Sequence, residues 1–379
     1  MTNKTIAIIG NDAFESPCIR EYDCSCKVGN NSIYQGHLAL GYGSGTTFFN
    51  YTTYPLESIT ARAEKEGIKI ISSGELSQEQ ITIGEKNITV GKENIDKAKE
   101  IAQQADLCIV FIMADSGERY IDLEKSKGDR YDLDAWHSGN DLVNAVLEVN
   151  QNVIVVINSP GPINLPWFEG IKGLIFSGLG GAESGNAITD ILFGDYNPSG
   201  HLPYIWAKKD DYPTPIDNIY AQPESIEYKE GVFVGQRYFD KYNKSYTFPF
   251  GYGLSYTEFE FVADSLSVSM SKEGLKVNFS MINNGTMKGE AVPMVFLKFP
   301  DNITTEEGYP DKLFKGFDKK WINPGEVVAF EIFVDDHALS YYNIFDKKYE
   351  RPIEGNYTVY VGLDARDYNK LQAEVNANY

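Results

Sequence analysis

This 379-residue chain has little positive charge, few histidines and cysteines, and no long apolar run. Its 34 lysines and arginines face 54 aspartates and glutamates, which leaves a formal net charge of −20. Nucleic acids and anionic membrane surfaces bind basic patches, so the composition argues against both as partners. Because no run of about 18 or more apolar residues is present, we expect no membrane-spanning helix. The composition suits a soluble protein with neutral ligands.

The usual patterns of metal and nucleotide sites are also missing. The histidines are widely scattered: His37, His137, His201 and His337. Cys18, Cys24 and Cys26 lie close together, but with so few histidines we expect no zinc site, and Cys108 is expected to be a small buried residue. Residues 41–45 read G-x-G-x-G, not the dinucleotide-binding G-x-G-x-x-G, and no helix follows directly. We therefore expect no metal and no cofactor.

The first part of the chain alternates apolar runs with helical patterns. The runs are continuous, as strands covered on both faces require. They are Thr5–Ile9, 68–71, Leu107–Met113, 153–157 and 174–176. Apolar residues at helical spacing fill the regions 95–105, 142–149 and 188–192, the last of which precedes Gly194 as a helix-ending glycine. This pattern predicts an α/β domain with a parallel sheet and flanking helices over residues 1–206.

The rest of the chain changes character twice. Residues 207–256 form a connector rich in Pro, Tyr and Asp, in which we expect six apolar residues to pack: Val232, Phe233, Tyr238, Phe239, Phe248 and Phe250. From Thr257 onward apolar and polar residues alternate in short runs, such as 275–281, 328–334 and 357–361. Asn283-Asn284-Gly285 is a hairpin signal, and Asn323-Pro324-Gly325 is a turn signal. We predict an all-β sandwich over residues 257–379.

Two polar loops follow strand-like runs in the first domain. Residues 114–118 (Ala-Asp-Ser-Gly-Glu) come directly after Leu107–Met113, and residues 41–46 follow Thr5–Ile9 after a long excursion. If both strands lie parallel in one sheet, both loops leave at the same edge, where open α/β sheets bind their ligands. Only the first loop carries carboxyl groups, so it is the stronger candidate for chemistry.

These loops resemble the matching segments of the fungal β-glucosidases of glycoside hydrolase family 3. The resemblance continues, in the family's order, through further motifs: Lys127-Gly128-Asp129-Arg130, Trp136-His137-Ser138-Gly139, residues 177–186, Asn197-Pro198-Ser199-Gly200 and residues 250–256. It covers the second half of a typical member and implies an α/β sandwich followed by a fibronectin type III-like domain. The leading (β/α)8-type barrel, which carries the nucleophilic Asp in the family, is not part of this sequence. No residue of this chain can be assigned as the nucleophile.

The resemblance also implies roles for particular residues. Relatives hydrolyse terminal β-D-glucosyl residues of β-glucosides or cello-oligosaccharides with two carboxyl groups about 5–5.5 Å apart. Glu118 matches the catalytic acid/base, and Ser44 matches a hydroxyl that helps to bind the sugar. Because Tyr120 and Ile121 follow Glu118, we expect partial desolvation, which favours the protonated form that a general acid needs.

Three residues near Glu118 affect this expectation. Asp129 and Arg130 are expected to form an ion pair that supports the acid loop. Arg119 stands where relatives have Gly, and its guanidinium would favour the ionised form of Glu118 and crowd the aglycone side.

Glu183 is a rival acid, but it lies at a predicted helix start near Gly185, with Ser184 as the N-cap, where the helix dipole keeps a carboxylate ionised. Trp136, Trp167 and Trp206 are expected to pack in cores rather than to form a sugar platform.

The resemblance implies a disulfide from Cys18 to Cys24 or Cys26. Nine N-x-S/T sequons begin at Asn3, Asn30, Asn50, Asn87, Asn243, Asn278, Asn284, Asn302 and Asn356. With the resemblance, they favour a secreted glycoprotein that acts outside the cell or at a cell wall in cellulose degradation, although the N-terminal residues do not resemble a secretory signal.

Three functions stay open. The chain is half of a β-glucosidase that needs a separate barrel domain as a partner, or a non-catalytic carbohydrate-binding or structural remnant. The third, a flavodoxin-like nucleotide binder, is disfavoured because no phosphate loop is present.

Overall fold

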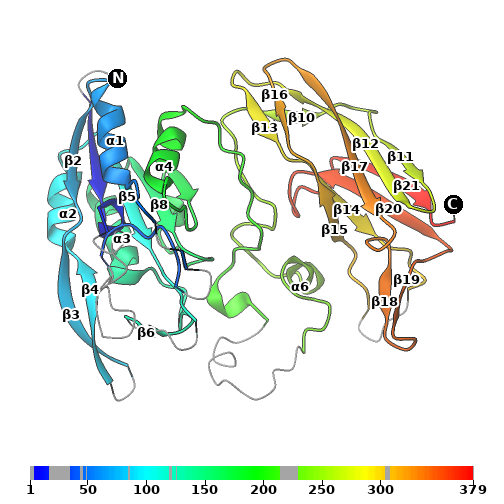
Figure 1. Cartoon of the computed structure of the whole chain (residues 1–379), viewed down its shortest axis with the longest axis horizontal. Coiled ribbons are helices and arrows are strands. Elements are labelled where there is room, and N and C mark those ends of the chain that lie inside the picture. Colours follow the sequence, from blue (N-terminus) through cyan, green and yellow to red (C-terminus); the bar gives the residue numbers. More distant parts are fainter. Residues whose placement is uncertain are drawn as a thin grey trace. The chain divides into compact units, whose positions relative to one another are not determined.

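The computed structural model in Figure 1 describes residues 4–16, 35–42, 46–47, 49–83, 86–118, 122–124, 126–213, 229–303 and 308–378. The chain divides into two compact units, Met1–Phe193 and Gly194–Tyr379. The first unit contains the predicted parallel sheet, and the second contains the predicted connector and β-sandwich. The domain boundaries at residues 206 and 256 stay predictions. No helix in the described ranges is long and apolar enough to cross a membrane.

A five-stranded parallel sheet is the centre of the first unit, with the order β2-β1-β5-β8-β9. The strands are β1 (Thr5–Ile9), β2 (Lys69–Ser73), β5 (Leu107–Met113), β8 (Val153–Asn158) and β9 (Gly173–Phe176). β1 and β5 have the predicted bounds and pair directly, with Ile8 opposite Ile109. Together with the antiparallel second unit, this sheet confirms the predicted fold class.

Four helices cover the sheet: α1 (Pro55–Glu64), α2 (Ile95–Ala102), α3 (Gly139–Val149) and α4 (Ser184–Phe193). α1 packs against α4, and α2 packs against α3 (Figure 1). Under α1 and α4 lies a core that includes Ile8, Phe111 and Ile59, all fully buried. Cys108 is a free, buried thiol whose Sγ is 3.9 Å from the Ala102 carbonyl of α2, which confirms it as a small core residue.

Local sequence explains the helix ends. α1 begins at Pro55, whose fixed φ suits the first helical position, and Asn94 caps α2 by accepting the Lys97 amide hydrogen at 3.1 Å. α4 ends before Gly194, whose φ of +73° ends the helix as predicted. The prediction of Ser184 as an N-cap was wrong, because Ser184 already belongs to α4 and its hydroxyl contacts His37.

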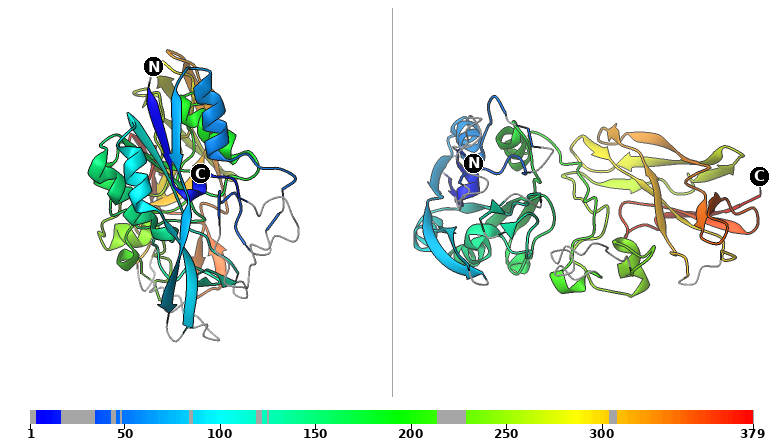
Figure 2. Two further views of the ribbon diagram at one scale, coloured as in Figure 1. Left: turned by 90° about the vertical axis from the view of Figure 1, so that its left-hand side faces the viewer. Right: turned by 60° about the horizontal axis from the view of Figure 1, so that its bottom comes forward.

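An antiparallel hairpin between β2 and α2 has no counterpart in the predictions. Its strands are β3 (Leu76–Ile83) and β4 (Lys86–Glu93), and it extends away from the sheet (Figures 1 and 2). The run Ser77-Gln78-Glu79-Gln80 is polar on both faces, so it gives no alternating signal. The hairpin ends at Glu93, which is buried beside the loop after β1.

The remaining short elements of the first unit are 3-10 turns and a small hairpin. They are η1 (Asn11–Ala13), β6 (Asp122–Leu123), β7 (Ser126–Lys127), η2 (Trp136–Ser138) and η3 (Phe168–Gly170). β6 and β7 pair with each other and lie between the acid loop and the predicted supporting residues 129 and 130.

The predicted connector packs into the second unit. It contains η4 (Lys209–Asp211) and α6 (Gln236–Lys241), and Trp206 bridges to Phe248. Phe239 is buried in a cluster with Ile205 and Ala207, and Tyr212, Tyr238 and Tyr246 pack against it. Of the six residues expected to pack, Val232 does not, because 44% of it is exposed.

Two antiparallel sheets form the β-sandwich. One joins β10 (Phe259–Phe261), β11 (Ser267–Met270) and β17 (Val327–Asp335) to β12 (Gly274–Asn283); the other has the order β15 (Leu313–Phe317), β14 (Met294–Lys298), β20 (Asn356–Gly362), β21 (Leu371–Asn376). Two smaller ribbons are β13 (Gly289–Ala291) with β16 (Lys320–Ile322) and β18 (Tyr341–Asn343) with β19 (Lys348–Glu350).

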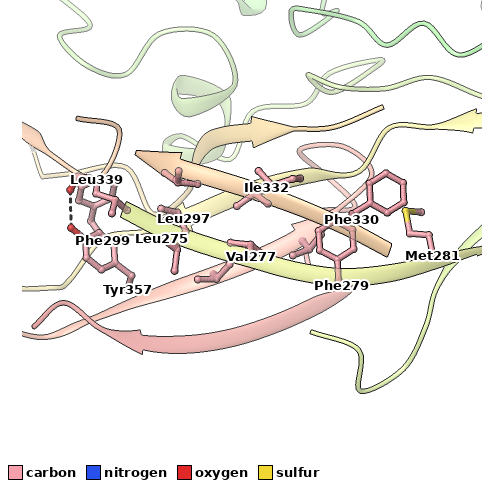
Figure 3. Packing of buried hydrophobic residues seen from close by; sticks show 14 of the residues in the cluster. Leu275, Val277, Phe279, Met281, Leu297, Phe299, Phe330, Ile332, Leu339 and Tyr357 are labelled. Carbon is pink, nitrogen blue, oxygen red and sulfur yellow. Dashed lines mark hydrogen bonds between the residues drawn. The ribbon is translucent and has the colours of Figure 1, made fainter. Parts of the chain in front are cut away.

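The predicted alternation in β12 and β17 places apolar side chains in the sandwich core (Figure 3). Phe279 of β12 stacks on Phe330 of β17 with ring centroids 5.5 Å apart. On β20, buried Tyr357 donates its hydroxyl hydrogen to the Leu339 carbonyl at 2.7 Å, so its polar atom is satisfied inside the core.

The expected hairpin at Asn283-Asn284-Gly285 was wrong, because β12 pairs with β10, β11 and β17 and not with the next strand, β13. Asn283 is buried instead. It accepts from the Thr257 hydroxyl at 2.6 Å and donates to the Ile322 carbonyl at 2.9 Å. At Asn323-Pro324-Gly325 the chain does turn, with Gly325 at φ +75°.

We predict that Phe330→Ala lowers the free energy of unfolding of the second unit by about 3–5 kcal/mol, because it removes a buried ring from the sandwich core. Phe333→Ala on the same strand is the matched control. Its ring is 47% exposed, so its effect should stay within about 0.5 kcal/mol. Urea unfolding of both variants measures the difference. Equal changes in the free energy of unfolding would contradict the assignment of Phe330 to the core and of Phe333 to the surface of β17.

Candidate active site at the carboxyl edge of the parallel sheet

The order in which strands are added to the sheet reverses between the parallel strands β1 and β5. β1 pairs with β2 on one side and with β5 on the other, so the connections after β1 and β5 leave in opposite directions. Such a switch point opens a crevice beyond the carboxyl ends of the strands. Gly10 begins the loop after β1 with a φ of +106°, and any side chain there would collide with the Phe111 carbonyl of β5.

The acid loop, residues 114–118, lies at this edge directly after β5. Its returning partner is the segment Gly128-Asp129: the Gly117 amide donates to the Gly128 carbonyl at 3.1 Å. Ser116 Oγ lies 3.5 Å from Asp129 Oδ1. Glu118, the last described residue of the loop, is half-buried. The segment therefore braces the loop at the two residues that directly precede Glu118.

Arg130 points elsewhere. Its Nη1 donates to the Pro162 carbonyl, in the loop after β8, at 3.0 Å. Among the described residues no ion pair joins Asp129 to Arg130, so the expected pairing was wrong. Asp129 contacts the acid loop, whereas Arg130 satisfies a carbonyl group on the neighbouring loop. The roles of both residues as support for Glu118 stay predictions.

The loop 35–42 meets the acid loop at the same edge. A methyl group at Gly41 would lie 3.9 Å from both Asp115 Oδ1 and the Ser116 carbonyl, and 3.0 Å from the Leu179 side chain. This contact agrees with the expectation that both loops leave the sheet on one side. Ser44 lies outside the described residues, as do Arg119, Cys18, Cys24 and Cys26, and the predictions for them stand untested.

A buried polar cluster fixes the loop 35–42 to the sheet. Asp12 Oδ1 accepts the Leu38 amide hydrogen at 2.7 Å, and Asp12 Oδ2 accepts from Asn158 Nδ2 at the end of β8. His37 Nδ1 lies 2.9 Å from the Asp12 carbonyl and therefore carries a proton, while its Nε2 lies 2.8 Å from Ser184 Oγ.

These distances resemble a Ser-His-Asp triad, but all three side chains are at most 1% exposed. A nucleophile must reach its substrate, so the cluster positions the loop rather than reacting. Sequence patterns did not reveal it, because Asp12 and Ser184 belong to elements far apart in the chain.

A second buried cluster anchors the β6–β7 turn. His137 Nε2 lies 2.6 Å from Glu124 Oε1, and both side chains are 3% exposed. Burial alone would lower the pKa of His137, but the Glu124 carboxylate that faces it, with Glu93 and Asp12 farther off, raises that pKa overall. The Glu124 carboxylate thus favours the charged form of His137, and the pair holds the turn that follows the acid loop.

Glu93 joins the two clusters. Its Oε1 accepts the Asn11 amide hydrogen at 2.7 Å, and its side chain is buried at the end of the β3–β4 hairpin. Burial raises the pKa of Glu93 to about 7, against the opposing effects of the Asn11 amide and of His137. Burial therefore favours the protonated carboxyl group at mildly acidic pH.

The rival residues behave as expected. Tyr51 donates to Glu183 Oε1 at 2.5 Å and Asn186 donates to Oε2 at 2.7 Å, and these hydrogen bonds lower the pKa of Glu183, which makes it a poor proton donor. Trp136, Trp167 and Trp206 are all buried, which confirms their packing roles. Within the described ranges no group of three or more His, Cys, Asp or Glu side chains is arranged to hold a metal ion.

Known proteins share this order of an α/β domain followed by a β-sandwich. Residues 1–256 match the model of the glycosyl hydrolase family 3 C-terminal domain, and residues 291–365 match that of the fibronectin type III-like domain. The chain therefore belongs to glycosyl hydrolase family 3.

Among its relatives, the probable beta-glucosidase L of Aspergillus fumigatus is 36% identical over 385 aligned residues, which cover 96% of this chain and 48% of the relative. The β-D-glucoside glucohydrolase of Trichoderma reesei superposes with a TM-score of 0.85 at 30% identity, covering 99% of this chain and 52% of that one. The β-glucosidase of Chaetomella raphigera has a TM-score of 0.86 at 33% identity, with 99% and 51% coverage. The chain spans about half the length of these relatives.

We predict that Glu93→Gln weakens the pH dependence of folding stability. Because the folded pKa of Glu93 is raised from 4.5 to about 7, its stability contribution is complete below pH 4.5 and is lost as the pH rises through 7. Gln cannot ionise, so the loss of about 3 kcal/mol in the free energy of unfolding that Glu93 causes between these pH limits should be absent in the variant. Urea unfolding from pH 4 to 8 measures it. Glu79→Gln is the control, because this side chain on the same hairpin is 42% exposed and pairs with Lys92. Identical pH profiles for Glu93→Gln and the native chain would refute the assignment.

Proposed function

We propose that this chain is the C-terminal half of a retaining β-glucosidase that hydrolyses terminal β-D-glucosyl residues, with Glu118 as the acid/base. The observation that carries the proposal is the position of Glu118: a half-buried carboxyl group at the switch-point edge, on a loop braced by Gly128. Membership of family 3 and the similarity to β-glucosidases support the substrate class. The nucleophilic carboxylate comes from a barrel domain of the kind found in family members.

In this reaction the nucleophile attacks C1 of the glucosyl residue while Glu118 donates its proton to the glycosidic oxygen, and the C1–oxygen bond breaks. A covalent glucosyl-enzyme forms and the aglycone leaves. Glu118, now ionised, then takes a proton from a water molecule, which attacks C1 and releases both glucose and the nucleophile. Ser44, on the loop that reaches Asp115 through Gly41, hydrogen-bonds the sugar.

Exposure of the sequons supports secretion and glycosylation. Six sequon asparagines in the described ranges are exposed: Asn50, Asn87, Asn243, Asn284, Asn302 and Asn356. Asn278, in the middle of β12, is half-buried. Oligosaccharides can attach at the exposed positions without disturbing either core. We propose an extracellular or cell-wall setting in which the enzyme degrades β-glucosides or cello-oligosaccharides released from cellulose.

A non-catalytic carbohydrate-binding remnant is the alternative. Arg119, next to Glu118, favours it, because a guanidinium group stabilises the ionised carboxylate and opposes acid catalysis.

We predict that the 379-residue polypeptide alone does not hydrolyse an aryl β-glucoside, because one carboxylate cannot serve both as nucleophile and as acid/base. Adding a family 3 barrel domain, in trans or as a fusion, should produce turnover that Glu118→Gln lowers by about 10²–10⁴-fold for substrates with poor leaving groups. Chromogenic release measures both.

The control is Glu183→Gln, which should keep the activity of the reconstituted enzyme. Sugar binding without turnover in every barrel fusion would favour the remnant. If the chain alone hydrolyses the substrate and Glu118→Gln abolishes that activity, the assignment of the nucleophile to a separate barrel domain would be overturned.

We predict that Arg119→Gly improves the reconstituted enzyme. Removing the cation favours the protonated form of Glu118 and clears the aglycone side, so the high-pH limb of kcat should move to higher pH. Arg119→Lys keeps the charge and is the control, with its limb unchanged. Identical pH–rate profiles for Gly and Arg would show that residue 119 points away from the acid.

A further inference from the structure

Asp115 is the most enclosed carboxyl group at the active edge. It stands two residues after β5 and three before Glu118, and its side chain is fully buried. Its Oδ1 accepts the Ser116 amide hydrogen at 2.7 Å and faces the backbone of Gly41 across the boundary between the two loops. Its Oδ2 is buried and has no hydrogen-bond partner among the described residues. Asp115 and Ser116 therefore lie on the side of the acid loop that faces Gly41 of the loop 35–42.

Few charges face this carboxyl group. Arg130 attracts its ionised form from the returning segment, but that guanidinium donates to the Pro162 carbonyl. Glu124, in the β6–β7 turn, repels the ionised form. Gly41, which faces this carboxyl group from the loop 35–42, carries no charge. An ionised Asp115 would leave one carboxylate oxygen buried without a donor, which is costly, whereas a protonated one needs to satisfy only a single hydroxyl group.

We propose that Asp115 is a positioning residue for acid catalysis: its buried, uncharged carboxyl group holds the acid loop against the loop 35–42 and so sets the place of Glu118. Burial raises the pKa of Asp115 to about 8, which agrees with a neutral group over the range in which a general acid works. The inference rests on the proposed function, because it is Glu118 that the loop carries. Above pH 8 the carboxyl group ionises, repels Glu124 and loosens the contact with Gly41.

The first test does not depend on activity. Difference infrared spectroscopy of the native chain against Asp115→Asn at pH 6 should show the carbonyl band of one protonated carboxyl group, and the band should vanish in the native chain as the pH rises through about 8. Asp190→Asn, an exposed carboxyl group on α4, is the control and should give no such band. Absence of the band at pH 6 would show an ionised Asp115 and overturn the proposal.

The second test measures the loop itself by hydrogen exchange at pH 7. Asp115→Asn keeps an acceptor oxygen for the Ser116 amide, so exchange at Ser116 and Gly117 should stay within about twofold of the native rate, whereas Asp115→Ala should raise it tenfold or more. Protection of Val110, within β5, reports whether each variant is folded. Unchanged exchange of the loop in a folded Asp115→Ala would also overturn the proposal. If Asp115→Ala does not fold, the native chain is compared with Asp115→Asn at pH 9. There the native carboxyl group is ionised, so the native loop should exchange faster than the loop of Asp115→Asn after correction for intrinsic exchange rates.

A third measurement separates this inference from the proposed function. In a barrel fusion, the high-pH limb of kcat for Asp115→Asn should extend beyond that of the native enzyme, while Asp190→Asn follows the native profile. If every fusion is inactive but the infrared and exchange results hold, the proposed function fails and the positioning of the loop stands. If the fusions are active and the limb of Asp115→Asn equals the native one, Asp115 does not position the acid.

Discussion

The adjacency of β1 and β5 is the constraint on which the rest of the first unit depends. Because β2 lies on the far side of β1, the strand order reverses at this pair, and the loops after β1 and β5 separate at the carboxyl edge. Backbone groups there have no strand partners and must be satisfied by side chains. Asp12 and Asn11 do this for the loop 35–42, and Asp115 does it for the acid loop. The same reversal that opens a crevice thus makes buried polar clusters necessary beneath it.

Those clusters contain more acid than base. Asp12, Glu93, Asp115 and Glu124 share the edge, whereas the cations near them are His137 and Arg130. Burying so many carboxyl groups is unfavourable unless some stay protonated, which explains why burial raises the pKa of both Glu93 and Asp115. Polar networks of this kind fix one arrangement of loops at some cost in stability, as is common where a site must be pre-organised. His137, held in a left-handed conformation with φ 56°, is a further sign of that compromise.

The second unit follows simpler rules. Strict alternation in β12 and β17 fills one core with rings and aliphatic side chains, and few buried polar groups interrupt it. Asn283 is an exception, because its side chain hydrogen-bonds to three segments, at Thr257, Met287 and Ile322. It therefore does not form the hairpin turn that the local sequence predicts. Tertiary hydrogen bonding here outweighed a local turn preference.

Local patterns by themselves determined the elements and their class. Continuous apolar runs marked β1 and β5 to the residue, alternation marked β12 and β17, and a motif on the loop after β5 singled out Glu118, because each of these signals lies among neighbours in the chain. The first half of the β3–β4 hairpin gave no such signal, since its run Ser77-Gln78-Glu79-Gln80 is polar on both faces. The clusters around His37, Glu93 and Asp115 were likewise decided only by the tertiary structure. Their partners are up to 147 positions apart. The burial that raises the pKa of Glu93 and Asp115 exists only after the sheet has brought those loops together.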